Sequence, residues 1–202
     1  DFESHMKLLG CKGTTGTQES FMKLFKDEEK VKQIDSKIAE KMGFDKVFGV
    51  SGQTYTRKVD SRVLNVLASI AESASKFAND MRLLQHEKEL EEPFEKSQIG
   101  SSAMAYKRNP MRSERINSLS KHAIALKMDP SITSATQWLE RTLDDSANKR
   151  ICIPEAFLAV DSILILYGNI SKNIVVYENV ISTNLMQELP FMATEEILMN
   201  AV

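Results

Sequence analysis

Apolar residues recur at intervals of three and four along most of this chain, a spacing that places them on one face of an α-helix. The longest stripe runs from Val59 to Leu84 with no glycine or proline inside it. It predicts one long helix, closed by Glu91-Glu92-Pro93 because a proline disfavours helical geometry in the residue before it. Such a helix is longer than a lone globular core can cover, and its alanines allow other helices to approach closely. The pattern therefore predicts an all-α protein built as an oligomeric bundle of long helices.

Two shorter helices are predicted ahead of this stripe. The segment Cys11–Thr17 has no apolar period and contains two glycines, which favours a loop. Thr17 is expected to cap the short helix that follows. An amphipathic helix is predicted over Asp27–Met42, with Gly43 as the left-handed residue that ends it. The irregular stretch Lys46–Tyr55 is interpreted as a linker.

Proline positions divide the next part of the chain. Pro110 suits the first turn of a new helix, and Asp129-Pro130 is expected to stop that helix. A short helical stretch is predicted around Thr136–Leu139. With 8 glycines and 5 prolines in 202 residues, the chain is poor in the residues that turns between many short strands need. This scarcity favours few, long helices.

An apolar segment dominates the C-terminal third. Asp144-Asp145-Ser146 offers cap chemistry for a helix, and Pro154 is predicted to begin or kink a long apolar helix. The most apolar part of that helix, Ala156–Tyr167, is too short to span a bilayer, so we expect a buried helix. The tail, Glu178–Val202, predicts two short helices, the second capped by Thr194.

Composition and charge narrow the classes of function. The chain is 42% hydrophobic and 27% charged, as expected for a soluble globular domain. With 26 Lys+Arg against 28 Asp+Glu, its net charge of -2 predicts no attraction to nucleic acid or to an anionic membrane. Cys11 and Cys152 lie far apart and in no CxxC spacing, which argues against a disulfide framework or a zinc site. Residues 1–10 lack the apolar run of a signal peptide, so a cytoplasmic protein is expected.

The loop Gln98–Pro110 concentrates unusual chemistry. It holds two adjacent serines, a lysine, an arginine and an asparagine. A generic loop of this kind is most often a solvated basic connection between two helices. The string Gly-Ser-Ser-Ala-Met-Ala-Tyr-Lys-Arg-Asn-Pro over residues 100–110, however, resembles the active-site loop of the fumarase/aspartase superfamily at every defined position except Ala105, where the superfamily has proline.

Further strings extend the resemblance over nearly the whole chain, and they are similar to the adenylosuccinate lyase family of the animal type. These strings are Lys12–Gln18, Gly52–Asp60, Glu91–Lys96, Tyr106–Arg115, Glu140–Asn148 and Glu188–Glu195. The resemblance implies an all-α fold in which the central helices of four subunits form a shared bundle. It also implies elimination of fumarate from adenylosuccinate, giving AMP, and from the succinylated imidazole-carboxamide ribotide SAICAR, giving AICAR, in purine nucleotide biosynthesis.

The resemblance assigns roles within the loop and the helix after it. Ser101 would be the general base that removes a weakly acidic C–H proton beside a carboxylate, with Ser102 supporting the loop at the substrate. A serine hydroxyl can do this only where cations and N–H groups surround it in a closed site. Lys107 and Asn109 would meet the succinyl carboxylates and stabilise the carbanion. Glu114 would orient the catalytic histidine of a neighbouring subunit.

A second group of residues resembles the family's substrate-binding positions. Arg141, Ser146 and Arg150 suit a nucleotide phosphate, since arginine forks and a hydroxyl near a helix N-terminus bind such groups. In isolation the two arginines would be taken as solvated surface residues. Arg115 is a weaker member of this group. Gln53 would hold a substrate carboxylate.

No cofactor and no metal is expected. His5, His86 and His122 have no partner at metal-ligand spacing, which favours surface or structural roles. The Gly/Thr loop that begins at Lys12 could cradle an anion but lacks the spacing of a P-loop. By resemblance the family's general-acid histidine would precede Asp1. Residues 1–202 are therefore expected to form the central helical domain, without the family's N-terminal and C-terminal domains and with an incomplete active site.

The expected partners are a small succinylated purine nucleotide and three further copies of the chain, with active sites shared between subunits. Two other interpretations stay open. Another fumarate-releasing lyase, acting for example on argininosuccinate, would share the loop but would not be expected to share the Arg141 group. A non-catalytic helical scaffold is the other alternative, although the joint presence of Ser101, Lys107, Asn109 and Glu114 argues against it.

Overall fold

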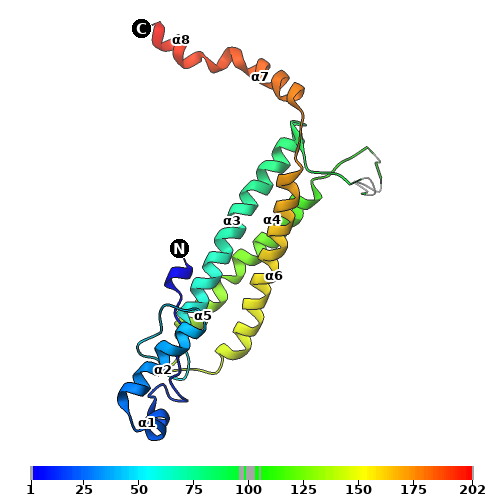
Figure 1. Cartoon of the computed structure of the whole chain (residues 1–202). Helices are drawn as coiled ribbons and strands as arrows, with labels where there is room; N and C mark the ends of the chain where they lie inside the picture. The colour runs from blue at the N-terminus through cyan, green and yellow to red at the C-terminus, as the bar shows by residue number, and fades with distance from the viewer. Residues whose placement is uncertain (1, 96–97, 99–102, 105, 202) are drawn as a thin grey trace. The chain divides into compact units, whose positions relative to one another are not determined.

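The computed structural model describes residues 2–95, 98, 103, 104 and 106–201 of the chain. Along the chain the elements are the 3-10 helix η1 (Glu3–His5), α1 (Glu19–Phe25), α2 (Glu28–Lys41), α3 (Lys58–His86), β1 (Leu90–Glu91), α4 (Met111–Leu126), α5 (Met128–Ala135), α6 (Asp145–Lys172), β2 (Val175–Val176), α7 (Glu178–Met192) and α8 (Thr194–Asn200) (Figure 1). They form two compact units, residues 1–69 with 125–157, and residues 70–124 with 158–202. Helices α3, α4 and α6 contribute to both units.

The predicted all-α class is confirmed. Strand structure among the described residues is confined to the antiparallel pair β1 and β2, with Leu90 opposite Val176, and to one bridge between Leu8 and Val47. The bridge involves the stretch interpreted as a linker. Neither feature forms a sheet large enough to carry a core of its own.

The first unit begins with two short helices near their predicted positions. Asp27 caps α2, its side chain accepting a hydrogen bond from the Lys30 N–H at 3.1 Å. Gly43 follows the helix with φ +75°, as predicted. The predicted cap of α1 is wrong by one residue, because Gln18 occupies the cap position with φ 59°. The Thr17 hydroxyl accepts only a long contact of 3.4 Å from the Glu19 N–H.

The prediction for the segment after α4 is wrong. Asp129-Pro130 was expected to stop a helix, yet α5 starts at Met128 and contains Pro130 in its first turn. A proline is tolerated there because the first N–H groups of a helix have no partner inside it. The stretch Thr136–Leu139, predicted to be helical, lies outside any helix, and Leu139 has φ 46°. Within this unit the hydroxyls of Ser61 on α3 and Ser131 on α5 lie 2.9 Å apart.

The second unit is built on parts of α3, α4 and α6 that lie side by side (Figure 1). Small residues of α3 are buried, including Ala71, Ala74 and Ala78. The rings of Phe77 and Tyr167 have centroids 4.3 Å apart and connect α3 to α6. Helix α3 ends at His86, five residues before the predicted stop, and β1 follows it.

Helix α6 is continuous through Pro154. By length and composition alone it could cross a membrane, a test that the core helix of a soluble protein also passes. Its Val160, Ile163 and Ile170 side chains are buried. The prediction of a buried helix holds for that side only, because apolar residues elsewhere on α6 are exposed, namely Ile151, Phe157, Leu158, Leu164 and Ile165.

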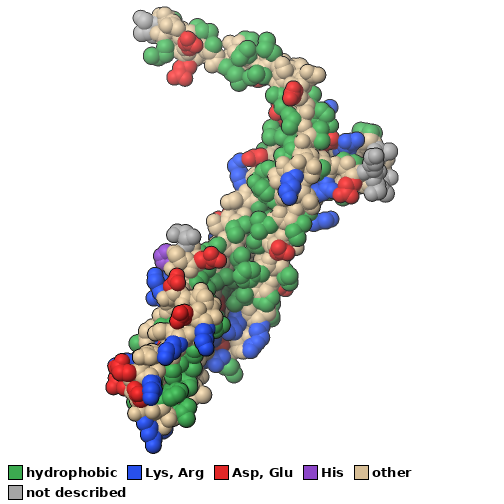
Figure 2. All heavy atoms as spheres, viewed as in Figure 1, with side chains coloured by type: hydrophobic (Ala, Val, Ile, Leu, Met, Phe, Trp, Pro, Cys, Tyr) green, Lys and Arg blue, Asp and Glu red, His purple; other side chains and the backbone are tan. Residues whose placement is uncertain are grey.

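The tail forms the two predicted helices, α7 and α8. The predicted cap is wrong, because Ala193 occupies the cap position of α8 and the Thr194 hydroxyl donates to the Phe191 carbonyl instead. Neither helix has a buried residue. Figure 2 shows apolar side chains on the surface of both. They include Leu185, Met186, Leu189, Phe191, Met192, Ile197, Leu198 and Met199.

Candidate active site

The second unit holds one part of the expected active site. Ser101 and Ser102 lie outside the described residues. Lys107, Asn109 and Glu114 line one cavity of about 1110 Å³, whose other walls come from the end of α3 and the segment after α6. Lys107 and Glu114 are exposed, and Asn109 is half-buried. A cation, an amide and a carboxylate thus face one space, where a ligand bearing carboxylates can meet the first two.

Glu91 joins the base of the loop to the segment after α6. Its Oε2 accepts hydrogen bonds from Arg108 Nη1 at 3.0 Å and from the Tyr177 hydroxyl at 2.8 Å. The hydrogen bond to Glu91 raises the pKa of Tyr177 above its ordinary value. The Arg108 guanidinium also lies over the Phe94 ring, 4.9 Å from its centroid. These contacts hold one wall of the cavity together.

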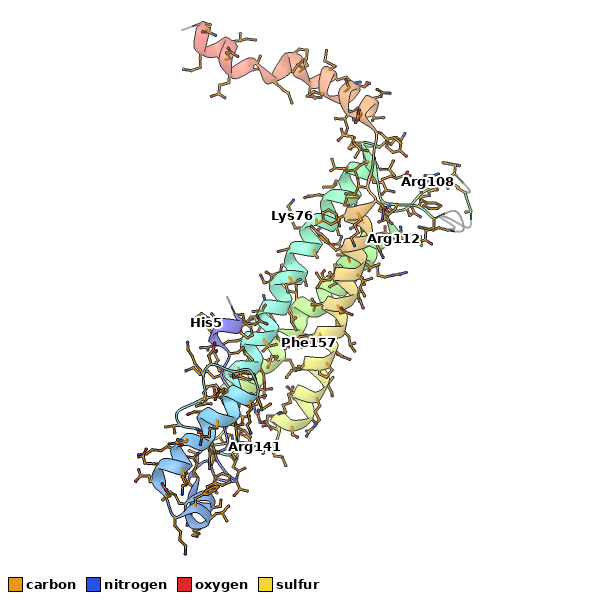
Figure 3. The ribbon with its side chains drawn as sticks, in the orientation of Figure 1. His5, Lys76, Arg108, Arg112, Arg141 and Phe157 are labelled. Atoms are coloured by element: carbon orange, nitrogen blue, oxygen red, sulfur yellow. The ribbon has the colours of Figure 1, made fainter. Side chains whose placement is uncertain are left out.

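A buried carboxylate, Glu92, lies behind this wall. It accepts hydrogen bonds from the first turn of α4, at Arg112 and Ser113. The Arg112 guanidinium in turn donates to the Pro93 carbonyl and, at 2.7 Å, to Glu95 Oε1. Figure 3 shows Arg112 and Arg108 at the base of the loop. Sequence reasoning missed Glu92, because contacts across about twenty positions are visible only in the fold.

Two further residues of this unit, His86 and Arg115, are exposed. His86, expected to have a surface or structural role, is exposed at the end of α3 and lines the cavity. Arg115 is exposed on α4. No local sequence signal marks His86, since its neighbours on the cavity wall come from other segments of the chain.

The first unit brings Gln53 together with the segment around Arg141. Both residues line a hollow of about 440 Å³, and Glu140 also lies in its wall. The Gln53 N–H donates to Glu140 Oε1 at 2.6 Å. Gln53 is exposed and Arg141 is half-buried, so both can be reached by a ligand.

Asp145 anchors the arginine segment at the start of α6. It is fully buried and accepts a hydrogen bond from Arg57 Nε. Arg141 Nη2 lies 3.5 Å from Asp145 Oδ1. Arg57 also lies over the Tyr55 ring, 4.7 Å from its centroid. Burial and a hydrogen bond to Asp60 raise the pKa of Tyr55 to about 12, so this phenol stays protonated beside the ion pair at neutral pH.

The other two members of the expected phosphate group are paired on the first turns of α6. Arg150 Nη1 donates to the Ser146 carbonyl at 2.8 Å and also to its hydroxyl. Ser146 lies at the helix N-terminus, where backbone N–H groups and the helix dipole favour an anion. Arg141, Ser146 and Arg150 belong to the first unit, and Lys107, Asn109 and Glu114 to the second.

The Gly/Thr loop has a structural contact at the position considered for anion binding. Lys12 is buried and forms an ion pair with Asp35, so its charge is already balanced. Asp35 also accepts from the Cys11 N–H at 2.7 Å. Gly16 has φ +79°, and an added Cβ there would overlap the Ser51 carbonyl. The described part of the chain contains no cluster of three His, Cys, Asp or Glu side chains that could hold a metal ion.

Comparison with known proteins gives a consistent family. Residues 29–125 match the profile of a family described as Lyase. The chain is 57% identical over 196 residues to adenylosuccinate lyase of Saccharomyces cerevisiae, covering 96% of this chain and 41% of that one. For adenylosuccinate lyase of Schizosaccharomyces pombe the identity is 54%, with 94% and 40% covered. The chain thus spans about two fifths of the length of the curated relatives it matches.

Solved structures share the fold at low identity. A 3-carboxy-cis,cis-muconate lactonizing enzyme from Pseudomonas putida matches with a TM-score of 0.78 at 19% identity, covering 98% of this chain and 42% of that one. A fumarate lyase from Mesorhizobium sp. BNC1 matches with a TM-score of 0.78 at 16% identity, with the same coverage. At such identities the likeness concerns the fold alone.

Proposed function

Since the chain belongs to the lyase family that includes these adenylosuccinate lyases, we propose that it is the central, loop-bearing part of an enzyme that eliminates fumarate from adenylosuccinate and from SAICAR. The observation that carries this proposal is the 57% identity to a yeast adenylosuccinate lyase across 96% of the chain. The same helices would form the oligomerising domain. Elimination at these substrates breaks a carbon–nitrogen bond and leaves AMP or AICAR with fumarate.

The proposed reaction needs a base, an acid and cations. Ser101 is the proposed base, taking the proton from the carbon next to a succinyl carboxylate. The carbanion that forms carries additional negative charge, which Lys107 and Asn109 would stabilise by binding the carboxylates. Support comes from the cavity that both residues line. Glu114, on the same cavity, would orient a histidine acid that protonates the departing nitrogen.

The nucleotide end of the substrate would be held by Arg141, Ser146 and Arg150, with Gln53 on a carboxylate. One feature of Arg141 supports this role. Its side chain is partly exposed in the wall of the hollow that Gln53 also lines, so the guanidinium can be reached by an anionic ligand. Ser146 and Arg150, at the start of α6, add a hydroxyl and a second guanidinium. Arg115 would contribute positive charge from α4.

We place the enzyme in the cytoplasm as a homotetramer with active sites shared between subunits. Both cysteines are free thiols, as a reducing compartment requires. Leu158, Leu164 and Ile165 on α6 are each at least half exposed in the single chain, and burying them against other copies would explain an apolar helix without a membrane. Sizing of the full-length protein by light scattering tests this, and a stable monomer at micromolar concentration would contradict it.

The activity is tested with the full-length protein that contains this chain. Fumarate release is followed with adenylosuccinate (succinyl-AMP) and, in a separate assay, with argininosuccinate. Turnover is expected with succinyl-AMP and not with argininosuccinate. Ser101→Ala should lower kcat by at least about a thousandfold, since it removes the base. Ser118→Ala, an exposed serine on α4, is the matched control. Turnover of argininosuccinate alone would overturn the substrate, and unchanged turnover in Ser101→Ala would overturn the role of that serine.

A further inference from the structure

The Glu92 side chain is almost fully enclosed, with 1% of its surface exposed. Its Oε1 accepts a hydrogen bond from the Arg112 N–H at 2.8 Å. Its Oε2 accepts from the Ser113 N–H at 3.0 Å and from the Ser113 hydroxyl at 3.1 Å. All three donors belong to the first turn of α4. A buried carboxylate is costly unless hydrogen bonds and nearby positive charge compensate, and here the N–H groups and dipole of α4 provide both.

This contact connects the two ends of the catalytic loop. Glu92 precedes the loop in the chain, whereas Arg112 and Ser113 follow it. Gln85 on α3 reinforces the same link, since its Oε1 accepts from the Glu92 N–H at 3.2 Å and its Nε2 donates to the Arg108 carbonyl at 3.3 Å. The entry and the exit of the loop are therefore fixed to one another and to α3.

The residues that this link holds are those facing the cavity. Glu114 comes directly after Ser113, and its N–H is bonded to the Pro110 carbonyl at 2.9 Å. Asn109 lies just before α4, and its carbonyl accepts from the Met111 N–H at 2.8 Å. A rotation of the first turn of α4 would move Glu114 and Asn109 together, because both are bonded to its backbone.

We propose that Glu92 is a positioning residue for the elimination, acting through the first turn of α4 on Asn109 and Glu114. This inference rests on the proposed function. A misplacement of about 1 Å in such groups can lower a rate by about a hundredfold, so a residue that touches no substrate can still control kcat. An ordinary helix cap would instead affect stability and leave the rate of folded enzyme unchanged.

The test compares Glu92→Gln with Asp27→Asn in the full-length protein. Both changes replace a carboxylate that accepts from the N-terminal N–H groups of a helix, α4 in one case and α2 in the other. Each variant is assayed for fumarate release from succinyl-AMP below its unfolding temperature, with kcat expressed per folded protein. Hydrogen exchange at the Arg112 and Ser113 amides reports the contact itself.

Glu92→Gln is expected to lower kcat at least tenfold and to raise exchange at both amides, because the amide group offers one acceptor oxygen where the carboxylate has two. Asp27→Asn is expected to keep kcat within about twofold and to lower the urea midpoint only slightly, because asparagine caps a helix about as well as aspartate and only the charge is lost. If Glu92→Gln does not fold, Ser113→Ala takes its place, with an expected threefold fall in kcat. A kcat within twofold of the unchanged protein, or unaltered exchange, overturns the proposal. Failure of the unchanged protein to release fumarate contradicts the proposed function, and this proposal falls with it.

Discussion

The backbone N–H of Gln53 donates to Glu140 Oε1 at 2.6 Å, although the two residues are 87 positions apart. Glu140 comes directly before Arg141, and the three residues line one hollow. A single carboxylate therefore ties the residue expected to hold a substrate carboxylate to the segment expected to hold the phosphate. In this arrangement Glu140 supports the position of Gln53.

Replacing Glu140 by alanine should weaken substrate binding by freeing the Gln53 backbone. A net hydrogen bond is worth about 0.5–1.5 kcal/mol, so we expect KM for succinyl-AMP to rise about threefold to tenfold with little change in kcat. Glu140→Gln keeps an acceptor oxygen and should stay within about twofold. The measurement is KM from steady-state kinetics on the full-length protein. Equal KM values for the two variants would argue against a role for this contact.

Gly16 should tolerate a side chain much less well than Gly43. Both have positive φ, +79° and +75°, and the left-handed conformation costs a non-glycine residue about 1–2 kcal/mol. A Cβ at Gly43 meets nothing within 4 Å, whereas one at Gly16 overlaps the Ser51 carbonyl. Urea unfolding should show Gly16→Ala less stable than Gly43→Ala by at least about 1–3 kcal/mol, the usual cost of overpacking. Equal losses would mean that the loop does not lie against Ser51.

Arg150 should matter for the phosphate in particular. Arg150→Ala is expected to raise KM for succinyl-AMP at least about tenfold, because it removes a charged donor beside Ser146. The same change should leave turnover of the phosphate-free analogue succinyladenosine unaltered. Lys149→Ala is the charge-matched control, because it also removes one positive charge near the start of α6. The Lys149 ammonium lies over the Tyr55 ring, 5.7 Å from its centroid, and was not assigned to the phosphate. Loss of activity towards both substrates in Arg150→Ala would argue for a structural role instead.

The buried thiol of Cys152 should make the fold sensitive to alkaline pH. Burial raises the pKa of Cys152 from 9.0 to about 11, so the folded protein favours the neutral thiol. The stability that this provides is complete below pH 9 and decreases as the pH rises from about 9 towards about 11. Urea midpoints measured across that range should fall for the unchanged protein and fall less steeply for Cys152→Ala. If the urea midpoints of the two proteins fall equally with pH, the Cys152 thiol does not cause the loss of stability.

Periodicity predicted the helices well where one apolar stripe continued without interruption. Helix α3 and the class of fold follow from it. Boundaries were less certain, because a proline such as Pro130 can stop one helix or sit in the first turn of the next, and local sequence does not distinguish the two. The burial of α6 was predicted only in part, since a hydrophobic pattern marks an apolar surface without naming what covers it.

The candidate site was also predicted only where a sequence motif marked its residues. Lys107, Asn109 and Glu114 were singled out by a motif, and the structure brings them to one cavity, while their roles stay a prediction. Glu92 and Tyr177 were not singled out. Each is bonded to partners distant in the chain, and although Glu92 lies in the family-like string Glu91–Lys96, nothing in that string pointed to its contact with α4.

Pro154 interrupts the backbone hydrogen bonding of α6 near the start of the helix. Proline has no N–H to donate, so the Arg150 carbonyl lacks the partner that it would have in an unbroken helix. The first turns, with Ser146 and Arg150, are therefore joined to the rest of α6 across a missing backbone hydrogen bond, and helices bend most readily at such positions. If the proposed function holds, a small bend at this point would let Ser146 and Arg150 follow the phosphate of either substrate, one with a purine base and one with a single imidazole ring, without a rearranged pocket.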